Sequence, residues 1–275
     1  MELGIFSKTF VRSSLNEVLD VVKDQRYTCV QFNMASAGLP SMPDSIPDSL
    51  PDEIHWSLSE HGLLMSALSG TFNMIHPDKK QREPGLERLG VLIQNAKEMG
   101  TDMITLCTGS FDSENMWRFH PENNSVNAWK MLCETMEQAI SMAENAGIYL
   151  GIEPELANVI NSAEKAKRLI NEMQSQQLRI VFDPANLFEK ASQKEIELII
   201  GKGLDLLAEH IHIAHAKDRT PDGSFATAGK GILPYWFFLK ELNQTGFDGP
   251  LITHGLEEDE AEFCYNFLNE QLNRI

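Results

Sequence analysis

Three strand-like segments in the second half of the chain each end on a residue type that commonly binds metal ions. Ile148–Glu153 (IYLGIE) ends on a glutamate, Arg179–Asp183 (RIVFD) on an aspartate and Ile211–His215 (IHIAH) on a histidine. About 30 residues separate each from the next, roughly one strand–helix–strand step. If these strands are parallel neighbours, their ends point into one shared space. The spacing therefore predicts that the three terminal side chains meet at one ion.

The donor types narrow the chemistry of such a site. Two carboxylates and an imidazole suit Mn²⁺, Co²⁺, Mg²⁺ or Zn²⁺, and a catalytic ion keeps one position open for substrate or water. Pro154 and Pro184 directly follow the two acids and end their strands, because proline cannot continue a ladder. Each acid alone could equally be a solvated strand end or a turn cap. Their coincidence with His215 favours one divalent ion held by the chain.

Alternation along the third segment separates its two histidines. Side chains of a strand point to opposite faces in turn, so His215 shares a face with Ile213 while His212 lies on the other. We therefore expect His215 to face the barrel interior and His212 to pack between the barrel and its helices.

Apolar runs alternate with helix-period segments along the whole chain, as in a parallel sheet covered by helices. The expected strands are Leu3–Phe6, Thr28–Phe32, Leu63–Leu68, Met103–Cys107, Ile148–Ile152, Arg179–Phe182, Ile211–His215 and Leu251–Thr253. The expected helices are Leu15–Lys23, Glu53–His61, Leu86–Met99, Val126–Asn145, Ala163–Gln174, Gln193–Ala208, Pro234–Asn243 and Glu258–Leu272. Eight repeats predict an α/β fold of the (β/α)8 TIM barrel type as a single domain over residues 1–275.

Four long segments follow expected strand ends and should build the active face of such a barrel. They are Leu39–Asp52, Thr71–Pro84, Gly109–Ser125 and Arg219–Leu233. The last contains the glycine-rich stretch Ala228–Gly231 (AGKG), which lacks the lead-in of a phosphate-binding loop. Its glycines are expected to allow a tight turn before the seventh helix.

Composition and charge exclude several classes of protein. The proportions of hydrophobic residues (42%) and charged residues (23%) are typical of a globular protein. No apolar run approaches the roughly 18 residues of a membrane helix, and the N-terminus lacks the features of a signal peptide. The four cysteines form no CxxC pair, which indicates a reducing, cytoplasmic setting. A formal net charge of −17 argues against a nucleic-acid partner, because phosphate binding needs a basic surface.

A series of motifs, in order along the chain, carries a resemblance to a known family. They are TFNMIHPD, LGVLIQNAKEMGTDMITLCTGS, MWRFHPEN, AENAGIYLGIEPE, IVFDPANL, HIAHAKD, and AGKGIL followed by GFDGPLI. Together they cover most of the chain, which resembles the xylose isomerase-like TIM barrels, specifically the sugar phosphate isomerase/epimerase group. The resemblance implies a small-molecule sugar or polyol substrate. Barrels of this group are often homodimers or homotetramers, and the sequence leaves both assemblies open.

The resemblance also implies a ligand set for one divalent ion. In that group the ligands follow the fifth to eighth strands as Glu, Asp, His and Glu. The first three carry over to Glu153, Asp183 and His215, but GPLITH places His254 where the second glutamate is expected. His254 could bind the ion through a neutral nitrogen, act as the second acid/base, or only form a hydrogen bond at the rim. Glu153 and His254 are thus the expected catalytic pair.

Further residues on the same face are candidates for substrate binding. Each could instead be an ordinary polar, charged or anchoring loop residue. Their expected roles are contact with sugar hydroxyls, a cation for a phosphate or an enolate oxygen, and an apolar wall against a sugar ring. They are His76, His120, Asn186, Lys217, Arg219 and Trp117, with Phe119 beside the last.

The expected function is a metal-dependent isomerase or epimerase acting on a sugar or sugar phosphate through a cis-enediolate. An inosose dehydratase-like lyase would use the same site but lose a hydroxyl from that intermediate. A non-catalytic metabolite-binding barrel would be the outcome if loss of the fourth carboxylate ended catalysis. An endonuclease IV-like DNA repair enzyme is disfavoured by the negative charge and by the lack of a full histidine set at the strand ends.

Overall fold

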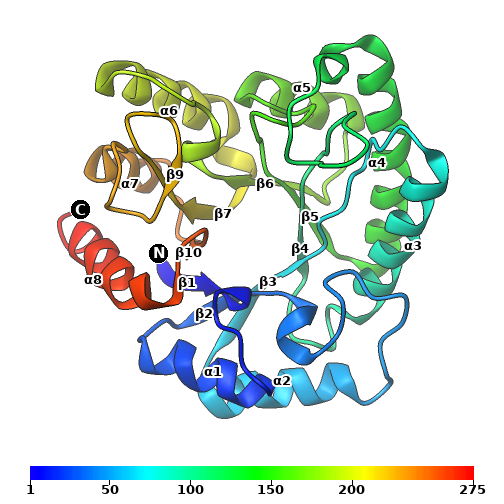
Figure 1. The fold of residues 1–275 in the computed structure, drawn as a ribbon, viewed down its shortest axis with the longest axis horizontal. Helices are drawn as coiled ribbons and strands as arrows, with labels where there is room; N and C mark the ends of the chain where they lie inside the picture. The colour runs from blue at the N-terminus through cyan, green and yellow to red at the C-terminus, as the bar shows by residue number, and fades with distance from the viewer.

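A closed barrel of eight parallel strands lies at the centre of the computed structural model, which describes residues 1–275 (Figure 1). The strands are β1 (Glu2–Phe6), β2 (Cys29–Phe32), β3 (Leu64–Ser69), β4 (Met103–Leu106), β5 (Tyr149–Ile152), β6 (Leu178–Phe182), β7 (Ile211–Ala216) and β10 (Pro250–Thr253). Around the barrel their order is β1-β10-β7-β6-β5-β4-β3-β2. This confirms the predicted (β/α)8 fold.

The eight α-helices of the chain surround the barrel (Figure 1). They are α1 (Leu15–Asp24), α2 (Leu50–His61), α3 (Lys79–Asn95), α4 (Val126–Ala146), α5 (Ala163–Met173), α6 (Gln193–Leu207), α7 (Tyr235–Gln244) and α8 (Ala261–Leu272). The main hydrophobic core, 60 buried residues, includes side chains of both the strands and the helices. None of the helices combines the length and the apolar character needed to cross a membrane.

The largest difference from the expected elements concerns α3, followed by α2 and α8, each of which begins three residues from its expected start. Helix α3 begins at Lys79 rather than Leu86, because the Asp78 side chain accepts a hydrogen bond from the Lys80 backbone N–H and caps the helix. Pro84 lies within its early turns. Helix α2 begins at Leu50. The expected loops Leu39–Asp52 and Thr71–Pro84 are therefore shorter than predicted, because each ends where a helix begins earlier.

Inward-facing side chains close the barrel interior with an apolar layer. Six of them form a separate buried cluster: Cys29, Ala67, Met103, Val181, Ile213 and Ile252. The other two strands, β1 and β5, contribute Gly4 and Gly151, where a Cβ would lie within 2.4 Å of Ile252 and within 2.3 Å of Met103. Every strand thus supplies one residue to this layer.

Two glycines in different surroundings allow a direct test of the packing inside the barrel. We expect Gly4→Ala to destabilise the protein by about 1–3 kcal/mol, because the new methyl would lie 2.8 Å from the Cys29 carbonyl oxygen. Gly201→Ala, inside α6 with no atom within 4 Å of the new methyl, should stabilise it by about 0.5–1 kcal/mol. Urea unfolding of both variants measures the difference. Equal changes in the free energy of unfolding for the two variants would contradict the close packing around Gly4.

Candidate functional site

The layer above the apolar one is largely polar, and it contains the residues that the strand ends predicted. Two residues beyond each member of the apolar layer, the strands carry Phe6, Gln31, Ser69, Thr105, Glu153, Asp183, His215 and His254. The last four follow neighbouring strands β5, β6, β7 and β10. One potential ligand atom from each lies within 4.8 Å of all the others. Period-2 alternation thus brings four residues that are distant in sequence to one point.

Glu153 and His215 form one half of this cluster. The Nδ1 atom of His215 lies 3.2 Å from Glu153 Oε1, and its Nε2 lies 2.8 Å from Gln31 Oε1. Gln31 is oriented by donating from its own amide nitrogen to Thr105. Because Gln31 Oε1 only accepts, His215 Nε2 carries a hydrogen. If the His215 ring is neutral, the lone pair on its Nδ1 faces the Glu153 carboxylate oxygen. Two acceptors that face each other repel, unless a proton or a cation lies between them.

Asp183 forms the other half and has a fully buried side chain. Its Oδ2 lies 3.2 Å from Lys217 Nζ and 3.3 Å from His254 Nε2. Its Oδ1 accepts from the Ala185 backbone N–H and caps the short 3-10 helix Pro184–Asn186. The predicted turn-capping role of Asp183 and its place in the cluster therefore occur together.

Asn186 joins the two halves. Its side-chain nitrogen donates to Glu153 Oε1 at 2.7 Å, and its oxygen accepts from Lys217 Nζ at 2.8 Å. Asn186 and Lys217 are both buried. They contact the cluster from outside the strand ends and orient its carboxylates, as outer residues do around metal ligands.

The electrostatics of the cluster keep its acids charged and His254 neutral. Burial opposes ionisation of Glu153, but His215 brings the pKa of that carboxyl below its usual value. Burial likewise opposes ionisation of Asp183, yet the Lys217 ammonium and the bond from His254 hold its pKa well below the ordinary range. Burial, then the charges of Lys217 and His215, lower the pKa of His254. Its imidazole therefore has a lone pair available near pH 7.

Two carboxylates and two imidazoles in this arrangement fit a divalent cation. Hard and borderline ions accept such mixed oxygen and nitrogen donors, and the facing acceptors of Glu153 and His215 are compatible with a shared positive charge. His254 takes the corner where the family resemblance led us to expect a glutamate. A neutral imidazole at this position can also serve as a ligand, and it suits borderline ions such as Zn²⁺ better than hard ions such as Mg²⁺.

A cavity of about 450 Å³ opens above the cluster. Six of the predicted site residues line it: Glu153, His215, His254, Asn186, Lys217 and Trp117. The lining also includes residues that the sequence did not indicate, among them Phe6, Lys8, Gln31, Ser69, Met116, Glu155 and Phe225. Burial raises the pKa of Glu155 to about 7, against the opposing charge of Lys217. Period-2 alternation could have identified Gln31, since it lies two residues after the inward Cys29.

His76, His120 and Arg219 do not line this cavity. His76 accepts from the Asp78 backbone N–H and donates to the Ser113 carbonyl, which ties two loops together. His120 caps the 3-10 helix Pro121–Asn124. The Arg219 guanidinium donates to the carbonyls of Ala185 and Gly223. Their polar atoms bond to backbone groups of the loops, and a contact with a sugar remains a prediction for these three.

The structure also bears on two other expectations, the position of His212 and the conformation of the AGKG stretch. His212 lies outside the interior layer, with its ring centroid 5.6 Å from that of Tyr149. The AGKG stretch wraps around the buried Asp218 carboxylate, which accepts from the backbone N–H groups of Gly229 and Gly231. Gly229 adopts a φ of +88°, so this stretch turns tightly, as predicted.

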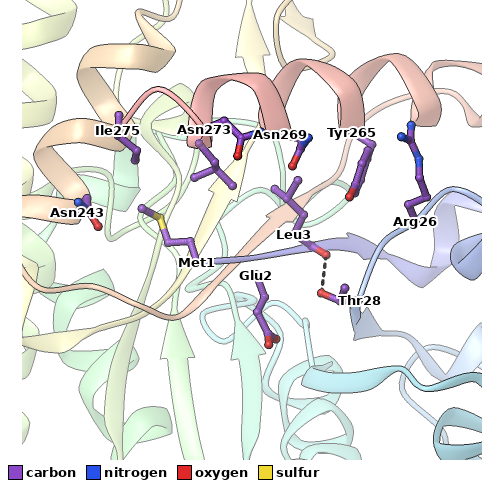
Figure 2. A pocket seen from close by; sticks show the side chains of 11 residues that line it. Met1, Glu2, Leu3, Arg26, Thr28, Asn243, Tyr265, Asn269, Asn273 and Ile275 are labelled. Atoms are coloured by element: carbon purple, nitrogen blue, oxygen red, sulfur yellow. Dashed lines mark hydrogen bonds between the residues drawn. The ribbon is translucent and has the colours of Figure 1, made fainter.

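A second cavity, of about 550 Å³, lies at the opposite end of the barrel (Figure 2). Met1, Leu3, Tyr265 and Ile275 are among the residues around it, and Thr28 donates to the Leu3 carbonyl there. This end of a (β/α)8 barrel serves stability rather than catalysis, and no cluster of potential metal ligands occurs there. The smaller cavity at the carboxyl ends of the strands is therefore the candidate active site.

Comparison with known proteins places the chain in a family. None of the curated proteins compared with it matches significantly. A solved 3-keto-D-glucoside 4-epimerase from E. coli shares 16% identity over 98% of this chain and 99% of its own, with a TM-score of 0.78. A xylose isomerase domain protein from Planctomyces limnophilus shares 18% over 99% and 96%, with a TM-score of 0.77. D-psicose 3-epimerase from Clostridium cellulolyticum H10 shares 13% over 99% of both chains, with a TM-score of 0.76.

At these identities the structural likeness establishes the shared fold. The family profile described as "Xylose isomerase-like TIM barrel" matches residues 19–269. That range includes all four strand ends of the cluster and most of the cavity lining. The chain therefore belongs to the xylose isomerase-like TIM barrel family.

Proposed function

We propose that this protein is a divalent-metal-dependent isomerase or epimerase of a keto sugar. The observation that carries the proposal is the convergence of Glu153, Asp183, His215 and His254 within 4.8 Å; all but the buried Asp183 line one cavity. Two of the structurally similar proteins are named as epimerases of a keto-glucoside and of psicose. These names support the choice of reaction class.

A divalent ion bound by these four residues would draw electron density from the substrate carbonyl and so acidify the neighbouring C–H group. The chain itself supplies the proton transfers. Glu153, ionised, removes the proton from the carbon beside the carbonyl and leaves an enediolate. Its conjugate acid can return that proton to the neighbouring carbon while the hydroxyl proton moves from one oxygen of the enediolate to the other, which gives an isomer.

Inversion at one carbon requires a second group on the other face of the sugar. His254 would fill this role. In one direction ionised Glu153 removes the proton and His254, present as the imidazolium, donates one from the opposite face; in the reverse direction neutral His254 removes the proton and protonated Glu153 donates one. Because burial lowers the pKa of His254 and favours its neutral form, inversion that starts at Glu153 requires His254 to take up one proton from solvent beforehand. Asn186 and Lys217 hold the carboxylates in place during the exchange.

The substrate in this proposal carries no phosphate. Lys217 is engaged with Asp183 and Asn186, and Arg219 is engaged with two backbone carbonyls and lies outside the cavity lining. Neither of these two cations is free to form the bidentate contacts typical of phosphate sites. Lys8, the other lysine that lines the cavity, offers a single ammonium and no planar fork of donors.

A lyase reaction on the same enediolate is the second candidate. It needs an acid beside the leaving hydroxyl, and the carboxyl of Glu155 lines the cavity two residues beyond Glu153. Elimination would then release water and yield a product with one oxygen fewer.

NMR in deuterated water separates these outcomes. We expect a panel of ketoses, keto-glycosides and inososes, incubated with the protein and Mn²⁺, Co²⁺ or Mg²⁺, to include a sugar that gains deuterium at carbon and keeps every oxygen. A product lacking one oxygen would support the lyase. No change in any sugar, with any of the ions, would reject both reactions and leave a binding barrel.

A further inference from the structure

Two large aromatic side chains lie exposed at the mouth of the candidate active site. Trp117 is 53% exposed and Phe225 is 49% exposed, and both line the cavity that contains Glu153 and His254. Trp117 follows β4 and Phe225 follows β7, strands that are three positions apart around the eight-stranded barrel. The two rings therefore reach the cavity from widely separated parts of the rim.

The exposure of Trp117 is built into its loop. Buried Asn158 accepts from the Gly109 backbone N–H and donates to the Met116 carbonyl. The Ser110 hydroxyl donates to the Arg118 carbonyl at 2.6 Å. Backbone groups on both sides of Trp117 are thus held by buried polar side chains, which keep the indole at the cavity instead of allowing it to fold into the core.

Phe225 is also held in place. It belongs to β9 (Phe225–Ala226), which pairs antiparallel with β8 (Asp218–Arg219). Lys217 Nζ and Arg219 Cζ each lie 4.0 Å from the centre of its ring. Such cation–π contacts fix the ring, yet almost half of its surface remains in solvent.

Aromatic side chains that line a cavity commonly supply its apolar contact area. The ion cluster and the polar layer around it offer the hydrogen-bonding groups for one sugar ring. Phe225 lies beside the cluster, because Lys217 Nζ is 4.0 Å from its ring centre and 3.2 Å from Asp183 Oδ2, so a ring bound at the cluster would lie next to it. Trp117 lines the cavity from another part of the rim, and a second ring attached to the first would extend over it.

We propose that the substrate is a neutral glycoside, in which a keto-sugar unit binds at the cluster beside Phe225 and a second ring, sugar or aromatic, packs against Trp117. This inference rests on the proposed function for the identity of the first ring. Its own basis is the aromatic rim, which presents flat faces to the C–H side of a pyranose or to an aryl ring. The two cations beside Phe225 are already engaged, Lys217 with Asp183 and Asn186 and Arg219 with two backbone carbonyls.

Binding measured without turnover tests the aromatic rim. The probes are methyl, p-nitrophenyl and disaccharide glucosides of both anomers (maltose and cellobiose), titrated into the Mn²⁺-treated protein by calorimetry. We expect at least one two-ring probe to bind more tightly than the methyl glucoside of the same anomer. Trp117→Ala should weaken that probe by roughly threefold to tenfold while leaving the methyl glucoside unchanged.

Phe119→Ala is the matched control. Phe119 lies on the same loop and is 50% exposed, but it does not line the cavity, so its loss should leave every affinity unchanged. Equal affinity for one-ring and two-ring probes in the wild type, or an unchanged preference in Trp117→Ala, would overturn the proposal. If the preference holds but no keto-sugar or keto-glycoside exchanges deuterium, the glycoside site stands and the proposed isomerase function fails.

Discussion

Glu153→Gln is expected to lower the rate of deuterium exchange into the substrate by about 10²–10⁴-fold, the usual contribution of a general base. The amide cannot accept the proton, although it preserves the shape of the side chain and can still accept the hydrogen bond from Asn186. Circular dichroism and urea unfolding should show a folded protein. NMR in deuterated water, on a sugar that the wild type converts, measures the effect.

Glu98→Gln provides the control for this substitution. Glu98 is exposed and lies after α3, so its variant makes the same change in net charge without touching the cavity. We expect wild-type exchange rates from it. Undiminished exchange by Glu153→Gln would remove Glu153 from the reaction and with it the proposed mechanism.

Asp183→Asn is expected to destabilise the ion-free protein by about 3–5 kcal/mol, the usual result of removing one partner of a buried ion pair. The Asp183 side chain is 0% exposed and lies 3.2 Å from Lys217 Nζ. Asparagine can still accept from Ala185, so the cap is retained, but the Lys217 ammonium would remain buried without a counter-charge. Urea unfolding in the presence of a chelator measures the loss.

A double variant separates charge from packing. Lys217→Met removes the unpaired ammonium and keeps most of the aliphatic chain, so combining it with Asp183→Asn should recover part of the lost stability. A loss below 1 kcal/mol for Asp183→Asn alone, or no recovery in the double variant, would show that the pair is not energetically coupled.

Periodicity was sufficient to predict the fold. Each of the eight barrel strands begins and ends within one residue of its expected position, because buried parallel strands are short apolar runs between turn signals. Helix α3 was harder to delimit, since the polar segment before Leu86 carries no apolar period. Its start depends on the Asp78 cap, and Pro84 within the helix argued for a loop.

The core of the candidate site could be predicted for the same reason, while its rim could not. Glu153, Asp183 and His215 each end a strand, so alternation alone brings them together. Phe225 belongs to a two-residue strand inside a loop, and its place depends on how that loop folds around Asp218. His76 shows the converse, because a loop histidine expected on the same face as the site bonds backbone groups of two loops.

Binding of one divalent ion by Glu153, Asp183, His215 and His254 is tested most directly by calorimetric titration of Mn²⁺ into chelator-treated protein. We predict saturation at one ion per chain in the wild type and in Glu98→Gln, with binding lost or weakened at least tenfold, about 1.4 kcal/mol, in Asp183→Asn. A wild-type protein that binds no ion, or an Asp183→Asn variant that is folded and binds as tightly as the wild type, would contradict the proposed metal site.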